Sequence, residues 1–108
     1  MYLTIQECSE ATLGEATRFV RRCFLKQEAP LLSRQERDDF LRLLSDKALY
    51  RRIAQGEIRL ICALDNDRIV ACALLENTCL LVFCTETRYR RSDAPAFLLD
   101  FILFFYLS

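Results

Sequence analysis

The spacing of apolar residues changes at Gly56, and this change limits the possible folds more than any other feature of the sequence. Before Gly56 the apolar positions follow the period of helices, and after it they follow the two-residue period of strands. The segments IRLICAL and RIVACALL are joined by residues 65–67 (DND), which suit a tight turn, so we predict a β-hairpin. Glu76-Asn77 forms a second turn before CLLVFCT, a strand apolar enough to be buried on both faces.

Helix start and stop signals divide the first half of the chain. The TLGE spacing at residues 12–15 is that of a capping box, and it opens a helix that stops before QEAP, where Pro30 interrupts. A second capping box at residues 33–36 opens the next helix. Ser45-Asp46 predicts a break and a new N-cap, so this part of the chain forms a helical pair.

The remaining elements complete one mixed domain. Residues 3–7 alternate apolar and polar side chains, which predicts a short first strand, and a last helix runs from about Pro95 to the end. The order β-α-α-β-β-β-α predicts an α+β fold with a central, mostly antiparallel sheet flanked by helices. At 108 residues and 53% hydrophobic composition, residues 1–108 are expected to form a single domain.

Composition excludes several classes of function. The chain has no histidine, so Ser-His and Cys-His nucleophile pairs are absent, and without CxxC pairs a metal site is not predicted. Its acidic and basic side chains cancel, so no overall field draws it to nucleic acid or membrane. No apolar run reaches the length of a membrane span, and we expect a cytoplasmic protein whose six cysteines are reduced core residues.

Several segments of the sequence, taken in order, match the motifs of one family. DNDRIVACALLEN, CLLVF and YRRSDAPAFLLDFI occur in the order of a D-x-K/R-I-V-G hairpin, an L-L-F-V strand and a Y-Q-G-x-G-I-G turn before a helix with paired leucines. The chain therefore resembles the amino-terminal two-thirds of a GNAT-type N-acetyltransferase. The resemblance covers nearly all 108 residues and implies a GNAT-like domain truncated after its third major helix, with no counterpart of the family's closing strands.

The segment that should bind pyrophosphate departs from the family pattern, Q/R-x-x-G-x-G/A. Aligned on Tyr89, residues 90–95 place Asp93 and Pro95 at the glycine positions, and a shift by one residue recovers only the final small residue, Ala96. Glycine would let the backbone approach a phosphate closely. The loop is therefore degenerate.

Two effects oppose each other in this loop. Pro95 removes an N–H donor from the helix N-terminus, and Asp93 repels a phosphate by about 1–4 kcal/mol. Against them, Arg88, Arg90 and Arg91 supply positive charge for phosphate oxygens. The sequence favours a weakened phosphate site; the simpler alternative is a solvated loop in which Asp93 only caps the helix.

The resemblance also implies acetyl-CoA as cosubstrate and a set of residues that contact it. The backbone of the preceding strand would bind the pantetheine arm at Cys84 and Thr85, or in a second register at Val82 and Phe83. The loop residues implied in cofactor binding are Arg90, Arg91, Ser92, Asp93, Ala94 and Ala96.

The chemistry of the family is direct attack of a substrate amine on acetyl-CoA. Glu76 and Glu86 are candidate bases, but exposed glutamates in turns are usually only solvated, so the catalytic residues stay unassigned. Cys84 has no base partner for covalent catalysis, and Tyr106 is no positional match to the tyrosine that often returns a proton to the thiolate.

We therefore expect an acetyl-CoA-dependent N-acetyltransferase acting on a primary amine, with activity weakened or lost. The alternatives are a non-catalytic GNAT-like module for protein–protein contact and a truncated product without a role of its own. The unpaired edge of CLLVFCT and the apolar AFLLDFILFFYL helix predict a homo-oligomer. A membrane-anchoring helix is the other interpretation of that segment, in which Asp100 is the only charge.

Overall fold

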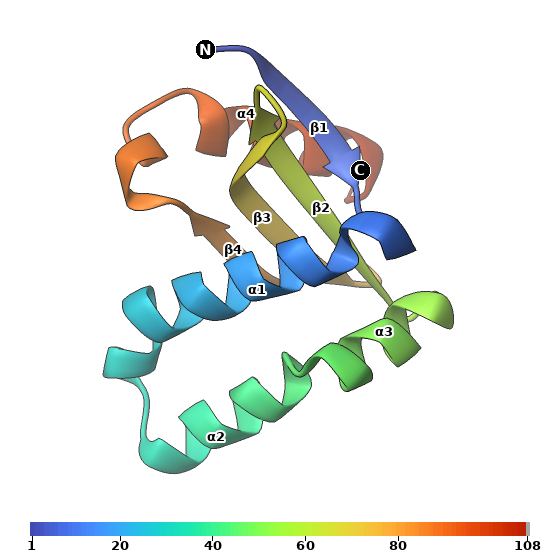
Figure 1. Cartoon of the computed structure of the whole chain (residues 1–108), viewed down its shortest axis with the longest axis vertical. Coiled ribbons are helices and arrows are strands. Elements are labelled where there is room, and N and C mark those ends of the chain that lie inside the picture. The colour runs from blue at the N-terminus through green and yellow to red at the C-terminus, as the bar shows by residue number, and fades with distance from the viewer. Residues whose placement is uncertain (108) are drawn as a thin grey trace.

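Four antiparallel strands form one sheet in the order β1-β2-β3-β4 (Figure 1). The computed structural model describes residues 1–107 and, within them, every side chain except that of Asp46. The strands are β1 (Leu3–Glu7), β2 (Ile58–Asp65), β3 (Arg68–Glu76) and β4 (Cys79–Thr85). The helices are α1 (Glu10–Gln27), α2 (Arg34–Leu43), α3 (Asp46–Ala54) and α4 (Ala94–Phe105), with short 3-10 turns η1 (Ala29–Leu31) and η2 (Thr87–Tyr89).

The predicted α+β fold and the strand order are confirmed, with small differences at the helix ends. The break predicted at Ser45 separates α2 from α3, so three helices lie between β1 and β2. The side chain of Asp46, and Ser108 at the end of the predicted last helix, lie outside the described residues. Helix α4 ends at Phe105.

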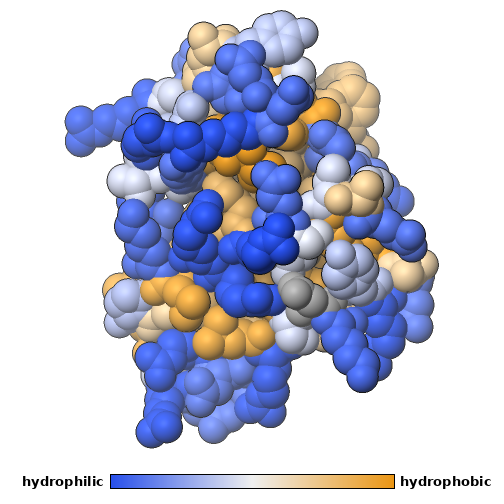
Figure 2. Space-filling view, viewed as in Figure 1, coloured by the Kyte–Doolittle hydropathy of each residue, from blue (hydrophilic) through white to orange (hydrophobic). Residues whose placement is uncertain are grey.

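The helices cover the two faces of the sheet unequally. Figure 1 shows α1 crossing the near face, with α2 and α3 below it in this view. Helix α4 crosses the far face, behind the strands. In the same view Figure 2 shows mostly polar side chains, with apolar ones gathered between α1 and α2. No helix of residues 1–107 is long and apolar enough to cross a membrane.

The two faces hold two separate sets of buried side chains, because neighbouring residues of a strand point to opposite faces. Small residues at the centre of the sheet let a helix approach from each side. The main buried residues between α1 and the sheet are Ala16, Val20, Cys62, Cys72, Leu74 and Cys84. Those between α4 and the sheet are Ile61, Ala63, Ala71, Ala73, Leu98 and Ile102.

The turns follow the sequence prediction. Asn66 (φ 49°) and Asp67 (φ 69°) form the two-residue hairpin turn, and Asn77 (φ 54°) lies in the next one. Gly56, at φ 74° after α3, takes the left-handed conformation that commonly ends helices.

One predicted helix start is wrong. Helix α1 begins at Glu10 with Ser9 as its N-cap, so the capping box at residues 12–15 does not open it. The hydroxyl of Thr12 instead accepts a hydrogen bond from the N–H of Ser9 at 3.1 Å, which closes a box one turn earlier.

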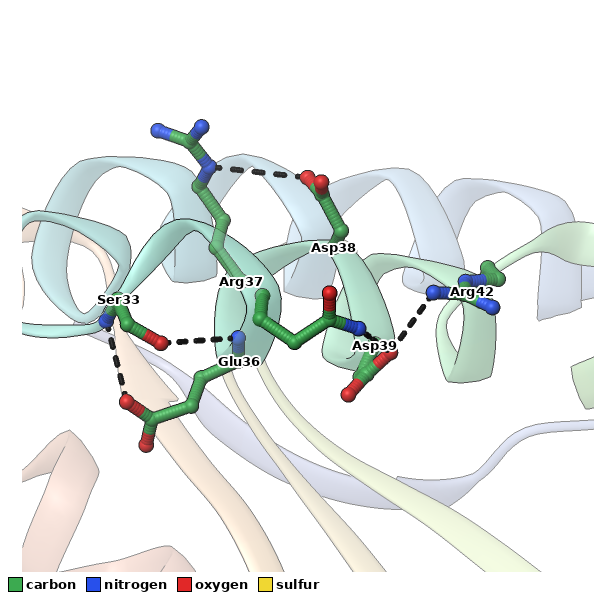
Figure 3. A network of polar contacts seen from close by, with 7 residues as sticks. Ser33, Glu36, Arg37, Asp38, Asp39 and Arg42 are labelled. Atoms are coloured by element: carbon green, nitrogen blue, oxygen red, sulfur yellow. Dashed lines mark hydrogen bonds and ion pairs between the residues drawn. The ribbon is translucent and has the colours of Figure 1, made fainter.

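The capping box predicted for α2 is confirmed (Figure 3). The N–H of Glu36 donates to Ser33 Oγ at 3.2 Å, and the N–H of Ser33 donates to Glu36 Oε1 at 3.1 Å. The side chain of Ser33 and then its backbone N–H, both hydrogen-bonded to the carboxylate, lower the pKa of Glu36. Asp39 and Arg42, three residues apart on the same exposed face, add an ion pair at 2.7 Å.

Three cysteines form a row across the sheet on the α1 face. Cys62 pairs with Cys72, and Cys72 pairs with Cys84, in adjacent strands. Desolvation raises the pKa of Cys72 to about 11, so its thiol stays protonated at neutral pH. These three and Cys23 are buried as predicted, whereas Cys8 is half-buried and Cys79 is exposed.

We predict that Leu98→Ala lowers the free energy of unfolding by about 2–5 kcal/mol, because Leu98 is fully buried between α4 and the sheet. The control is Leu31→Ala, at a residue of η1 that is 85% exposed, which should change stability by about 0.5 kcal/mol or less. Urea denaturation of the two variants measures this. Equal effects of the two substitutions would contradict the packing of α4 described above.

Candidate functional site

The candidate site lies where β4 ends, at the open side of the sheet. Strand β4 pairs with β3 on one side and has no strand on the other among residues 1–107. Leu74 pairs with Val82 and Leu75 pairs with Leu80, so Leu81 is an extra residue in β4. Such a bulge bends the strand and increases its twist, which opens the edge beyond it.

The hydrogen bonds of β4 decide which backbone groups face this open edge. The N–H of Glu86 donates to the carbonyl of Val70 in β3 at 2.9 Å. Because hydrogen-bonded pairs alternate in an antiparallel ladder, the groups of Cys84 also face β3, while those of Phe83 and Thr85 face outward.

A contact from α1 agrees with this orientation. Gln27 Nε2 donates to the carbonyl of Thr85 at 3.0 Å. The open edge therefore presents Thr85 from the first predicted register and Phe83 from the second, and cofactor binding at these strand positions stays a prediction. The Cys84 side chain is buried, and its hydrogen bond with Cys23, together with burial, raises the pKa of its thiol.

The loop after β4 is tied to the β2–β3 hairpin. The hydroxyl of Tyr89 donates to Asp65 Oδ2 at 2.9 Å, and the N–H of Tyr2 donates to Asp65 Oδ1 at 3.0 Å. The N–H of Tyr2 and then the hydroxyl of Tyr89 hold the pKa of Asp65 below its usual range. This contact fixes where the loop starts relative to the sheet.

The N-terminus of α4 has few donors left for a phosphate. Ser92 Oγ donates to the carbonyl of Tyr89 at 2.7 Å and accepts from the N–H of Ala94 at 3.2 Å. Asp93 is the N-cap, yet its side chain makes no capping hydrogen bond, and Pro95 has no N–H. Ser92 therefore satisfies the N–H of Ala94, while Asp93, the cap in the simpler interpretation of the sequence, holds the N-cap position without a side-chain bond.

The predicted loop residues differ in exposure. Ala94 is buried against the sheet, whereas Asp93 and Ala96 are exposed at the helix start. Arg90 and Arg91 are exposed, and no ion pair between described residues involves them. Both arginines lie a few residues before the start of α4, so their charges add to the partial positive charge of that helix N-terminus.

The two candidate bases lie at opposite ends of β4. Glu76 pairs with Cys79 at the start of the strand and its carboxylate bonds to Arg52, so it belongs to a structural ion pair. Glu86 follows the last residue of the strand, and its side chain is 21% exposed. Its Oε1 accepts from Arg68 Nη2 at 2.8 Å, while its Oε2 is buried and has no hydrogen-bond partner within the described part of the chain.

Glu86 borders a cavity of about 360 Å³ between the second half of α1 and the end of β4. We call this cavity the basic pocket. Its charged lining residues are Arg22, Lys26, Arg68, Arg88 and Glu86. Cys23, Gln27 and Thr87 complete the walls. Of the four cations, only Arg88 was identified from the sequence. The four-residue spacing of Arg18, Arg22 and Lys26 nevertheless indicated a basic face of α1.

The fold is similar to that of solved N-acetyltransferases. PaiA N-acetyltransferase from Thermoplasma acidophilum, solved with coenzyme A, aligns with a TM-score of 0.71 and 17% identity over 93% of this chain and 69% of that chain. An acetyltransferase of the GNAT family from Staphylococcus aureus aligns at 0.64 and 17% identity over 95% and 64%. The chain has the GNAT-type N-acetyltransferase fold.

Other comparisons define the extent of this likeness. A predicted acetyltransferase from Clostridium acetobutylicum with acetyl-CoA aligns at 0.68 and 14% identity, over 94% of this chain and 71% of that chain. The GNAT-type fold is therefore represented here over about two thirds of the length of these proteins. No protein-family model matches the sequence, and no curated protein matches it significantly.

The Asp65 contact predicts a pH dependence. The folded-state pKa of Asp65 lies below the unfolded value of about 3.9, so its stabilising effect is present above that pH and disappears as the pH falls through the folded-state pKa. Asp65→Asn should therefore lower the melting temperature at pH 7, and the difference from wild type should shrink below about pH 4. A difference that is constant from pH 7 to pH 2 would contradict this.

Proposed function

We propose that the chain is an acetyl-CoA-dependent N-acetyltransferase that transfers an acetyl group to a primary amine. The observation that supports this most is the open edge of β4, where the backbone groups of Phe83 and Thr85 face outward, in a fold shared with N-acetyltransferases solved with coenzyme A or acetyl-CoA.

The residues fit coenzyme A only in part. The backbone groups of Phe83 and Thr85 at the open edge would pair with the pantetheine arm as with another strand. Arg90 and Arg91 would contact the diphosphate, whereas Ser92 and Pro95 reduce the donors of α4. We therefore expect weak binding of acetyl-CoA, carried by charge more than by the helix N-terminus.

Glu86 is the proposed general base. Acetyl-CoA would supply the thioester, and the outward N–H of Thr85 or Phe83 would polarise its carbonyl. The Glu86 carboxylate, whose side chain is 21% exposed, would accept a proton from the ammonium group of the acceptor, which leaves the amine free to attack. Arg68 and Arg88, at 2.8 Å and 3.5 Å from Oε1, hold the carboxylate in place.

A second candidate function is a non-catalytic GNAT-like interaction module. The hydrogen bond from Ala94 to Ser92 and the missing donor at Pro95 favour it, because together they remove two of the groups that hold a phosphate. In this case the chain would act through its surface and would not bind coenzyme A. The binding experiment below separates the two.

We predict that acetyl-CoA raises the melting temperature in a saturable manner. At one hundred times its dissociation constant a ligand stabilises by about 2.7 kcal/mol, which corresponds to roughly 10 °C in a domain of this size. Arg90→Ala combined with Arg91→Ala should remove most of the shift, because these side chains supply the free positive charge near α4. Differential scanning calorimetry measures both.

The matched control for this experiment is Arg34→Ala combined with Arg51→Ala, two exposed arginines on α2 and α3. This variant should keep the full shift. A wild-type protein that melts cooperatively and shows no shift with acetyl-CoA would contradict the acetyltransferase proposal and favour the interaction module.

We also propose that the chain forms a homodimer in the cytoplasm. The six free cysteines support the cytoplasm, where thiols stay reduced. The outer side of α4 exposes Phe97, Leu99, Leu103, Phe104 and Phe105. A second copy placed there would cover these apolar side chains and leave the edge of β4 open for coenzyme A.

Leu103→Glu combined with Phe104→Glu should therefore convert the dimer to a monomer, because charged side chains resist burial in an apolar interface. Leu31→Glu, at a residue that is 85% exposed in η1, is the control and should leave the dimer intact. Sedimentation velocity distinguishes the species. A wild-type chain that sediments as a monomer at all concentrations would refute the dimer.

A further inference from the structure

Positive charge is concentrated in the basic pocket, although the complete chain has a net charge of zero. Four cationic side chains and one carboxylate line this cavity of about 360 Å³. A neighbouring cavity of about 250 Å³ shares Arg22 and Arg68 and adds Arg18 and Glu15. The local field between α1 and the end of β4 therefore attracts anions.

Two of the four cations in the basic pocket have no acidic partner. No ion pair between residues 1–107 involves Arg22 or Lys26. Arg22 lies over the ring of Phe19, with its guanidinium carbon 5.5 Å from the ring centroid, and this contact does not occupy its N–H donors. Arg22 and Lys26 are one turn apart on α1, so both reach the pocket from the same wall.

The other two cations are held in place but only partly neutralised. Arg68 Nη2 lies 2.8 Å and Arg88 Nε lies 3.5 Å from Oε1 of Glu86, so two guanidinium groups share one carboxylate. Each guanidinium has five N–H donors, and these contacts leave most of them for a ligand. Four cations against one carboxylate leave an excess of positive charge, which comes from α1 on one side and from β3 and η2 on the other.

This lining fits a phosphate group better than a carboxylate. A phosphate monoester carries a charge of about −1.5 to −2 at neutral pH and has three strong acceptor oxygens. It can therefore contact both Arg22 and Lys26 while a third oxygen faces Arg68 or Arg88. A carboxylate has one charge and two oxygens, so it would leave more of the positive charge uncompensated.

We propose that the basic pocket binds a phosphate group, with Arg22 and Lys26 as its main contacts. The inference goes beyond the proposed function and does not depend on acetyl transfer. The pocket lies on the α1 face of the sheet, whereas Arg90 and Arg91 precede α4, which covers the other face. The phosphate belongs either to a separate phosphorylated molecule or to the phosphate monoester of coenzyme A, and the experiment below distinguishes these two sources.

Phosphorus NMR of the full chain measures the binding of inorganic phosphate, at low salt because salt screens these charges. We expect a saturable change in the chemical shift of the phosphate. Arg22→Gln combined with Lys26→Gln should weaken binding at least about tenfold, because charge-assisted contacts are lost. Arg34→Gln combined with Arg51→Gln removes the same charge from exposed positions of α2 and α3 and should leave binding unchanged.

Two further measurements test the chemistry of the pocket. Glu86→Gln removes a negative charge beside Arg68 and Arg88 and should tighten phosphate binding at least about threefold. Acetate should displace no more phosphate than chloride does at the same ionic strength. The proposal is overturned by the absence of a saturable shift, by binding that is unchanged without Arg22 and Lys26, by weaker binding in Glu86→Gln, or by acetate that competes as well as phosphate itself.

Coenzyme A is the second probe, because its phosphate monoester and its diphosphate give separate phosphorus signals. A shift of the monoester signal that requires Arg22 and Lys26 assigns the pocket to coenzyme A. Binding of inorganic phosphate by these residues without a shift of either coenzyme A signal supports the pocket and refutes the acetyltransferase proposal. A chain that binds acetyl-CoA through Arg90 and Arg91 but does not bind inorganic phosphate refutes the pocket alone.

Discussion

The burial of β3 on both faces is the constraint on which the rest of the structure depends. Residues 69–75 are all buried, by α1 on one side and by α4 on the other. Small side chains such as Ala71, Cys72 and Ala73 make this possible, because they let both helices pack closely on the sheet. In the sheet β3 lies between β2 and β4, which leaves β4 at the edge.

The position of β4 in turn creates the candidate site. Because Cys84 lies under α1, the alternation of side chains puts Glu86, two residues later, on the same face, beside the second half of α1. The same pairing turns the backbone of Thr85 outward. One strand end therefore brings together an open backbone edge, a carboxylate and the cations of a helix that lies far away in the sequence.

The sequence predicted the elements better than the site, for physical reasons. Periodicity, the DND turn and Gly56 are local signals, and the structure confirms them. The start of α1 was missed because Thr12 suits two positions. It can be an N-cap itself, and it can also close the capping box of an N-cap at Ser9, which is its role in the structure. The basic pocket was missed because α1, β3 and η2 form it together, and only their packing shows that Arg22 and Arg68 line one cavity.

The charges around the end of β4 divide into two groups with different roles. Arg68 and Arg88 are neutralised in part by Glu86, so they position the carboxylate, whereas Arg22 and Lys26 keep their full charge toward the pocket. Arg90 and Arg91 follow within a few residues and stay exposed beside a helix N-terminus that Ser92 has already satisfied. In the proposed function, phosphate recognition would therefore rest less on oriented backbone donors, which act at short range, and more on flexible charges, which attract anions at longer range with less geometric selection.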